Sequence, residues 1–147
     1  MESLKIEQIP WGTPAYEAGL QLRDAVLRRP LGLAIEDDDL QGEARDIHIR
    51  AIGASQATLG VLLLRRVDEY TLQMKQVAVA EFSRGQGVGK QLVRFSEELG
   101  AARGYHSIML HAREAAVPFY SKLGYEPEGE MFMEVGIRHQ RMLKRLV

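Results

Sequence analysis

Residues 77–90 read VAVAEFSRGQGVGK, and this stretch decides how the fold is interpreted. It begins at the apolar end of a segment of alternating polarity, which predicts a β-strand over residues 72–79. After a glycine-rich turn, apolar residues recur every three or four positions, which predicts an amphipathic helix from about Gly87 to Arg103. The first N–H groups of a helix lack partners and carry partial positive charge. Together with Arg84 and Lys90, they suit a bound phosphate.

The glycine spacing separates this loop from two other phosphate-binding loops. A P-loop requires a glycine, four residues and then Gly-Lys-Ser/Thr, but Arg84 stands at the first glycine position and Gln91 replaces the hydroxyl residue. A dinucleotide fingerprint requires Gly-x-Gly-x-x-Gly within a β-α-β unit. Here Gly85, Gly87 and Gly89 alternate instead, and they follow a series of strands. Neither a P-loop nor a dinucleotide-binding fold is predicted.

The segments on either side complete a pattern of strands followed by helix–strand units. Alternating polarity predicts strands over residues 4–9, 47–52, 58–67 and 72–79, of which the last three form an antiparallel meander. Helical spacing predicts helices over residues 14–28 and 115–123, and Gly104 is placed to end the helix between them. A buried strand is expected at residues 107–110, and two closing strands from Tyr125 onward and over residues 137–146.

The bulk composition indicates one globular domain and excludes several classes of protein. A chain of 147 residues with 46% hydrophobic content is long enough for one core and too short for two, so a single domain over residues 1–147 is predicted. It has no cysteine and therefore no disulfide framework or thiolate nucleophile. A formal net charge of −1 gives no reason to expect nucleic acid or a membrane surface as a partner.

Several sequence signals are absent, and their absence restricts the expected chemistry and cellular location. The chain begins without a secretory pattern and has no apolar run near the roughly 18–20 residues of a membrane span, so we expect a cytoplasmic protein. The four histidines show no metal-ligand spacing, and Asp37-Asp38-Asp39 lacks the alternation of a calcium loop, so no metal is expected. No Gly-x-Ser-x-Gly elbow of a serine hydrolase occurs. The acidic run is interpreted as a solvated loop.

Two motifs resemble the GNAT superfamily of N-acetyltransferases. They are Arg84-x-x-Gly87-x-Gly89, with its flanking strand and helix, and Ala116-x-x-Phe119-Tyr120-x-x-Leu123-Gly124-Tyr125. The resemblance extends from Leu72 to Tyr125. It implies a mixed, largely antiparallel α/β (α+β) sheet of about six or seven strands flanked by helices.

A narrower likeness to small bacterial GNAT proteins of unassigned substrate rests on three further segments. These are Arg23-x-x-Val26-Leu27, Leu110-His111-Ala112 and Phe132-x-Glu134-x-Gly136-Ile137-x-His139-x-x-Met142. One departure is Arg113. The superfamily often has asparagine at this position and this subgroup often has glutamine, so any ligand contact made by their amide side chains is in doubt for this chain.

The resemblance also implies the cofactor and the residues that bind it. Acetyl-CoA would pair with the backbone of the strand and place its pyrophosphate on the glycine loop. A backbone N–H near Val77 would polarise the thioester carbonyl. The residues assigned to the cofactor are Val77, Ala78, Val79, Arg84, Gly85, Gln86, Gly87, Val88, Gly89 and Lys90.

Acetyl transfer to an amine further requires an acid for the thiolate and a base for the ammonium. Tyr120 matches the tyrosine that protonates the thiolate in many family members, although its position also suits a core aromatic residue. Four candidates for the base remain open: Glu134, His139, His111 and Glu81. Glu134 and His139 are preferred because they fall in the subgroup pattern, and each also suits an ordinary polar residue on a strand.

The predicted function is transfer of acetyl from acetyl-CoA to a primary amine of a small molecule, by direct attack in a ternary complex. The alternatives are a non-catalytic acyl-CoA-binding sensor module and an acetyltransferase for protein lysines or N-termini. Arg28 and Arg29 are interpreted first as a solvated helix end, with recognition of an acidic acceptor as the alternative. A homodimer is compatible with the sequence but is demanded by no part of it.

Overall fold

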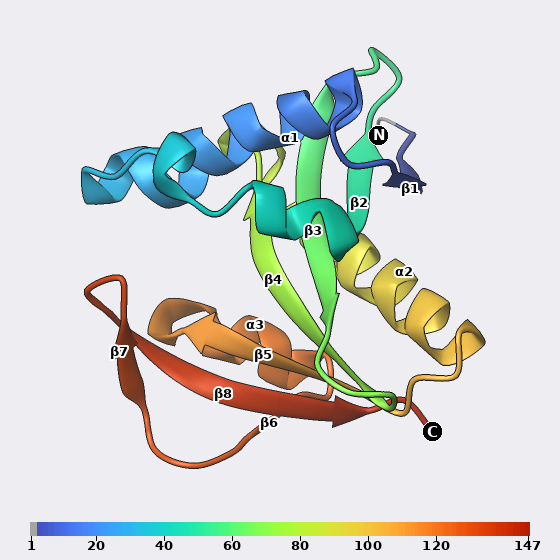
Figure 1. The fold of residues 1–147 in the computed structure, drawn as a ribbon, viewed down its shortest axis with the longest axis vertical. Coiled ribbons are helices and arrows are strands. Elements are labelled where there is room, and N and C mark those ends of the chain that lie inside the picture. The colour runs from blue at the N-terminus through green and yellow to red at the C-terminus, as the bar shows by residue number, and fades with distance from the viewer. Residues whose placement is uncertain (1–2) are drawn as a thin grey trace. The chain divides into compact units, whose positions relative to one another are not determined.

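The computed structural model describes residues 3–147, which fold as eight strands and three α-helices with short 3₁₀ and π turns (Figure 1). The strands are β1 (Lys5–Ile9), β2 (Ile47–Ile52), β3 (Thr58–Arg66), β4 (Thr71–Val79), β5 (Ser107–Arg113), β6 (Glu126–Pro127), β7 (Phe132–Glu134) and β8 (Ile137–Arg145). The helices are α1 (Pro14–Arg23), α2 (Val88–Ala102) and α3 (Val117–Lys122).

The strands are hydrogen-bonded in the order β1-β2-β3-β4-β5-β8-β6, and β7 pairs with β8. The pairs β1–β2, β2–β3, β5–β8, β6–β8 and β7–β8 are antiparallel, whereas β4 and β5 run parallel. This confirms the predicted mixed, largely antiparallel sheet. The strand number is higher than predicted because β7 has only three residues, too few to show a periodic pattern, whereas β6 falls in the strand predicted from Tyr125 onward.

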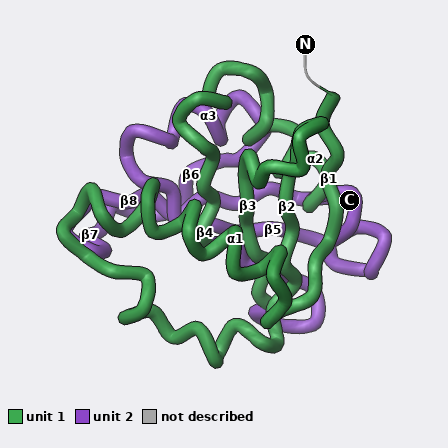
Figure 2. Tube along the Cα trace, turned by 90° about the horizontal axis from the view of Figure 1, so that it is seen from above, with its two compact units in different colours: residues 1–65, 76–96 green, residues 66–75, 97–147 purple. Residues whose placement is uncertain are grey.

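The chain forms two compact units (Figure 2). The first comprises residues 1–65 and 76–96, and the second comprises residues 66–75 and 97–147. Strand β4 and helix α2 each contribute residues to both units. The single domain over residues 1–147 stays a prediction.

In the first unit, local sequence signals place α1. The Thr13 hydroxyl accepts a hydrogen bond from the Tyr16 N–H, and Pro14 occupies the first turn, where its missing N–H costs nothing. Tyr16 and Leu20 are buried in a cluster with Ile9. The predicted helix over residues 14–28 is confirmed in its bounds, although the α-helix ends at Arg23 and the last five residues, Asp24–Arg28, form a π-helical turn.

Helix α2 confirms the predicted amphipathic helix. Its residues Val88, Leu92 and Val93 are almost completely buried, which fixes the end of the helix that follows the glycine loop. Gly60 of β3 makes this packing close, because a Cβ atom there would lie 2.7 Å from Leu92 Cδ1 and 3.0 Å from Val88 Cγ1. At the other end Gly104 has φ +88°, as predicted for a glycine that ends a helix.

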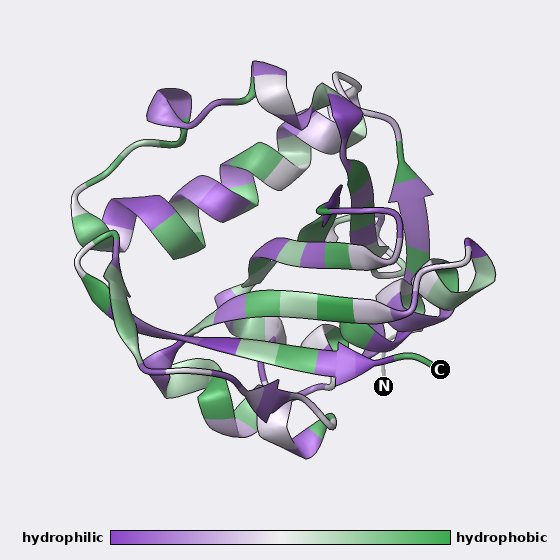
Figure 3. Ribbon diagram, turned by 60° about the horizontal axis from the view of Figure 1, so that its bottom comes forward, coloured by the Kyte–Doolittle hydropathy of each residue, from purple (hydrophilic) through white to green (hydrophobic). Residues whose placement is uncertain are grey.

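In the second unit, β5 is largely buried, and His111 and the two end residues are its more open positions. Ile108, Leu110 and Ala112 are buried, as is Met142 of β8, which lies opposite Leu110 in the register. The alternation of hydrophobic and hydrophilic residues is coloured in Figure 3. The predicted helix over residues 115–123 is shorter than expected, because Glu114–Ala116 form a 3₁₀ turn and Pro118 then sits in the first turn of α3.

Within residues 3–147, no helix combines the length and hydrophobicity needed to cross a membrane.

Candidate active site

The glycine loop has the backbone geometry of a close-approach site. Gly85 and Gly87 have φ values of +79° and +81°, which L-residues with side chains rarely adopt. A Cβ built on either glycine would have no atom within 4 Å, so their backbone faces open space. The first helical bond runs from Gln91 N to Gly87 O at 3.0 Å, which leaves the N–H groups of residues 88–90 without helical acceptors.

The side chains of the loop complete an anion-binding environment. Arg84 and Lys90 are exposed at the start of α2, where they add full charges to the partial charge of the helix end. Gln86 Nε2 donates to Phe82 O at 3.3 Å and closes the loop on itself. Glu81, one of the predicted base candidates, is exposed in the 3₁₀ turn before the loop. These residues fit the pyrophosphate of coenzyme A, because unpaired N–H groups, open glycines and two cations converge on one turn.

Strand β4 carries a strained residue immediately before the predicted cofactor strand. Gln76 has φ +58°, in the left-handed region, although it is neither glycine nor asparagine and lies within a strand. Such strain persists only where the surroundings hold it, and it is concentrated at functional sites. Arg28 Nη2 donates to Gln76 Oε1 at 3.2 Å and supplies one such constraint. Sequence reasoning missed Gln76, because glutamine gives no signal for positive φ.

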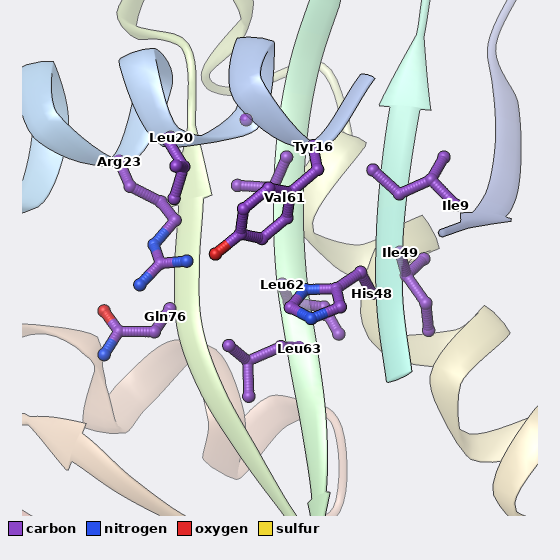
Figure 4. A pocket seen from close by; sticks show the side chains of 11 residues that line it. Ile9, Tyr16, Leu20, Arg23, His48, Ile49, Val61, Leu62, Leu63 and Gln76 are labelled. Carbon is purple, nitrogen blue, oxygen red and sulfur yellow. The ribbon is translucent and has the colours of Figure 1, made fainter. Parts of the chain in front are cut away.

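A small pocket of the first unit is bordered by Gln76 and by buried polar residues of α1 and β2 (Figure 4). The side chains of Tyr16 and Arg23 extend from α1 toward β4, and His48 lies beside them on β2. His48 Nε2 contacts the backbone carbonyl of Glu43 at 2.8 Å, and its ring meets the Tyr16 ring edge-on. His48 is thus a core residue with satisfied contacts.

Glu43 and Arg23 form a buried ion pair beside this pocket. Arg23 Nη1 and Nη2 each donate to a Glu43 carboxylate oxygen at 2.7 Å, and the Tyr16 hydroxyl donates to Glu43 Oε1 at 2.9 Å. Burial raises the pKa of Tyr16, and the hydrogen bond to Glu43 raises it further. Burial alone would lower the pKa of Arg23, but Glu43 holds it above its ordinary value. Arg23 Nε is buried without a partner among the described residues.

Arg28 and the acidic run Asp37-Asp38-Asp39 are predicted to be solvated, and this prediction is wrong for Arg28 and Asp38. Arg28 is buried, and its Nε and Nη2 donate to the two oxygens of Asp38 at 2.9 Å each. Arg29 does extend into solvent, where it pairs with Asp24 at 2.6 Å. Since Arg28 is already paired with Asp38, it offers no free cation to an acidic acceptor. The sequence did not predict this contact, because Arg28 and Asp38 are ten positions apart and are brought together by turns that carry no periodic pattern.

Tyr120 is buried on α3 in the second unit. Its ring contacts those of Phe119 and Tyr125, both nearly perpendicular to it. Burial raises the pKa of Tyr120, so the phenol keeps its proton at neutral pH. The structure therefore supplies a protonated donor, while the ring contacts also match the alternative of a core aromatic residue.

Glu134 and His139, the preferred base candidates, lie together with His111 in the second unit. Glu134 Oε1 is 3.1 Å from His111 Nδ1, and Glu134 Oε2 is 3.6 Å from His139 Nε2. The ring of Phe132 stacks on His139 and meets His111 edge-on. Among the residues that the structure describes, no group of three or more acidic or histidine side chains is arranged to hold a metal ion.

The predicted site residues therefore divide between the two units of the chain. All of the predicted cofactor residues, 77–79 and 84–90, belong to the first unit. Tyr120, Glu134 and His139 belong to the second, where Glu134 and His139 are in contact.

Comparison with known sequences identifies the family. Residues 33–146 match the family model of the acetyltransferase (GNAT) domain. An uncharacterized N-acetyltransferase of Bacillus subtilis, YjcF, is 31% identical over 110 residues, which cover 74% of this chain and 76% of that protein. The uncharacterized B. subtilis protein YyaT is 35% identical over 81 residues, so the match spans about half of each chain, 55% in both cases.

Solved structures share the fold over nearly the whole length. A crystal structure from Lactobacillus plantarum superimposes with a TM-score of 0.86 and 24% identity, covering 99% of both chains. An aminoglycoside 6'-N-acetyltransferase complexed with coenzyme A gives a TM-score of 0.81 with 16% identity, covering 97% of both chains. At these identities the structures support the fold, and the family match supports the activity. The chain belongs to the GNAT acetyltransferase family and is an acyltransferase that takes its acetyl group from acetyl-CoA.

Proposed function

We propose that this protein transfers the acetyl group of acetyl-CoA to a primary amine of a small molecule, by direct attack of the amine in a ternary complex. The observation that carries the proposal is the glycine loop. Gly85 and Gly87 hold positive φ in open space at the start of α2, beside two exposed cations. This combination suits a pyrophosphate, and the family to which the chain belongs uses coenzyme A.

The cofactor would lie along the end of β4 and over the loop. The backbone of residues 77–79 would pair with the amide groups of the pantetheine arm, in the manner of an added strand. The N–H near Val77 would face the thioester carbonyl, and a preorganised donor of this kind contributes about 3–4 kcal/mol to transition-state stabilisation. The strained Gln76 directly precedes these residues, which supports a functional reason for the distortion of β4.

Tyr120 is the proposed acid for the departing thiolate. Its raised pKa means that it holds a proton at the moment the C–S bond breaks. A thiolate released in a desolvated site also has a raised pKa, because burial disfavours its charged form as well. The two shifts offset each other, so the phenol can still donate.

The base belongs to the cluster of Glu134, His139 and His111. A primary amine is mostly protonated at neutral pH, so a proton must leave before the nitrogen can attack. The cluster offers two imidazoles that contact the same carboxylate, and imidazole is the side chain used most often as a general base. No such group of bases was found on the glycine loop, where Glu81 is exposed and alone.

The test is calorimetric titration with acetyl-CoA, with ATP and NAD as controls, followed by release of free thiol in the presence of amines. We expect saturable binding of acetyl-CoA alone. The variant Gly87→Glu should abolish binding, because it places a carboxylate and a side chain where the pyrophosphate would lie. Gly104→Glu is the matched control, since Gly104 has φ +88° and equally open surroundings but lies at the far end of α2.

Each outcome decides a different part of the proposal. Normal binding by a folded Gly87→Glu variant would refute the assignment of the loop. Binding without thiol release from any amine would favour the sensor module, and release only with peptides would favour protein acetylation.

A further inference from the structure

We infer that His111, rather than His139 or Glu134, is the general base of the reaction, with its Nε2 as the atom that receives the proton. This inference rests on the proposed function. In the proposed arrangement, Glu134 orients His111, and His139 is a buried residue that packs beside Glu134 and Phe132. The argument uses the contacts, the tautomers and the exposure of the three side chains.

The three side chains share one face of the second unit's strands. In the register, His111 lies opposite Arg141, and His139 lies opposite both Arg113 and Phe132. Because successive residues of a strand point to opposite faces, His111 is on the face away from the buried Leu110 and Ala112. His111 is half-buried on that face, between the buried Met109 and the half-buried Arg113 along the strand.

His139 is placed to support and not to react. Its side chain is only 4% exposed, and both ring nitrogens face protein atoms. A carbonyl oxygen can only accept a hydrogen bond, so the 2.8 Å contact with Ile137 O places a proton on His139 Nδ1. Nε2 then lies 3.6 Å from Glu134 Oε2, too far for a hydrogen bond and without a proton to donate, and an amine could reach it only by displacing that carboxylate.

In His111, by contrast, the Nε2 atom is available to a substrate. A carboxylate also only accepts, so the 3.1 Å contact with Glu134 Oε1 places the proton on His111 Nδ1 and leaves the lone pair on Nε2. No hydrogen bond within the described residues uses Nε2, and the His111 side chain is 30% exposed. A carboxylate that orients one nitrogen while the other takes a proton is the arrangement of an activated base in general acid–base catalysis.

The turn that presents Glu134 carries backbone strain. Val135 has φ +47° and Gly136 has φ +75°, and together they connect the paired residues Glu134 and Ile137. A β-branched residue in the left-handed region is a true outlier, and such strain persists where the structure over-determines it. The strained turn fixes the carboxylate beside His111.

The surroundings of His111 include further charged side chains. Arg141, opposite it on β8, pairs with Glu128, and Arg138 pairs with Glu114 at 3.4 Å. His139 of β8 faces the second oxygen of Glu134, and Phe132 of β7 closes the edge of the His111 ring. Glu134 is thus the carboxylate in direct contact with the His111 ring.

The proton and electron balance is complete. The ammonium gives one proton to His111 Nε2, and the nitrogen lone pair forms the C–N bond as the C–S bond breaks. The second amine proton leaves as the amide forms, and Tyr120 protonates the thiolate and is reprotonated by that proton. The imidazolium, stabilised by Glu134, then releases its proton to water. The sum is an amide, coenzyme A thiol and one proton.

The first test needs no substrate. Long-range ¹H–¹⁵N spectra report the tautomer of each of the four histidines. We expect His111 as the Nδ1–H tautomer in the wild type and a shift toward Nε2–H in Glu134→Ala. A wild-type His111 with its proton on Nε2, or no change on removal of Glu134, would overturn the inference.

The second test uses the amine that gives the fastest thiol release. His111→Ala should lower kcat/KM for that amine by about 100-fold or more, with acetyl-CoA affinity unchanged and partial rescue by added imidazole. It should also change the shape of the pH–rate profile, because the group that accepts the proton is removed. His106→Ala, at a histidine stacked on Tyr70, is the matched control and should change neither quantity.

The outcomes separate the inference from the proposed function. An unchanged rate and pH profile in His111→Ala would refute the role of His111 while leaving acetyl transfer intact. Failure of the wild type to acetylate any amine would instead refute the proposed function.

Discussion

Replacing Arg23 by methionine should destabilise the protein strongly, because it leaves Glu43 buried without its ionic partner. Both side chains are about 4–5% exposed, and two hydrogen bonds of 2.7 Å join them. Breaking a buried pair by removing one partner costs about 3–5 kcal/mol. For a chain of this length each kcal/mol lowers Tm by about 2–4 °C, so a decrease of about 6–20 °C is expected.

The assay is equilibrium unfolding in urea, followed by fluorescence of the single tryptophan. Trp11 is a local reporter, because its ring lies 6.0 Å from that of Tyr16, which donates to Glu43. The double variant Arg23→Met/Glu43→Leu should recover most of the loss, since a packed apolar pair often equals or exceeds a buried ion pair in stability. It also removes the unpartnered Arg23 Nε.

The control is an exposed ion pair in the second unit. Arg138 and Glu114 approach to 3.4 Å with side chains 59% and 51% exposed, so Arg138→Met should change stability by less than about 1 kcal/mol. If Arg23→Met cost no more than this control, or if the double variant were less stable than the single one, the argument from burial would be wrong.

Three further changes test other parts of the structure. Gly60→Ala should cost about 1–3 kcal/mol in urea unfolding, because the new Cβ would lie 2.7 Å from a methyl group of Leu92; wild-type stability would show that α2 can shift without penalty. Tyr120→Phe should lower kcat far more than acetyl-CoA affinity, and unchanged turnover would return Tyr120 to a purely structural role. Lys144→Met should cost about 2–3 kcal/mol in thermal unfolding, because it removes the 3.0 Å contact to the partly buried Glu97, and a neutral result would contradict that contact.

The features that the sequence predicted correctly depend on local chemistry. Helix α2 and its terminal Gly104 follow from residues three or four positions apart, and the loop from the spacing of Gly85 and Gly87. A helix stripe and a glycine turn are encoded within a few residues, so one sequence is enough to find them. The early strands, β1 to β4, are also predicted from patterns within a few residues.

The features that the sequence did not predict depend on where distant residues meet. Asp38 joins Arg28 only because several short turns bring the chain back, and no pattern in the acidic run marks that return. His111 and Glu134 could each be proposed from a subgroup likeness. Their contact depends on the registers of β5 with β8 and of β7 with β8, which the sequence does not specify.

Net stability alone does not explain why the first unit contains buried charges. Asp38 accepts from Arg28 and, at 3.4 Å, from Arg23, and Arg28 in turn holds the side chain of Gln76. A buried ion pair contributes little net stability over apolar packing, so its value must lie in fixing a conformation. Gln76 is the residue that such contacts would hold, because its φ of +58° is strained and the residues proposed to pair with the cofactor start at the next position. We therefore interpret these charges as the scaffold that keeps β4 distorted where the acetyl group would be transferred.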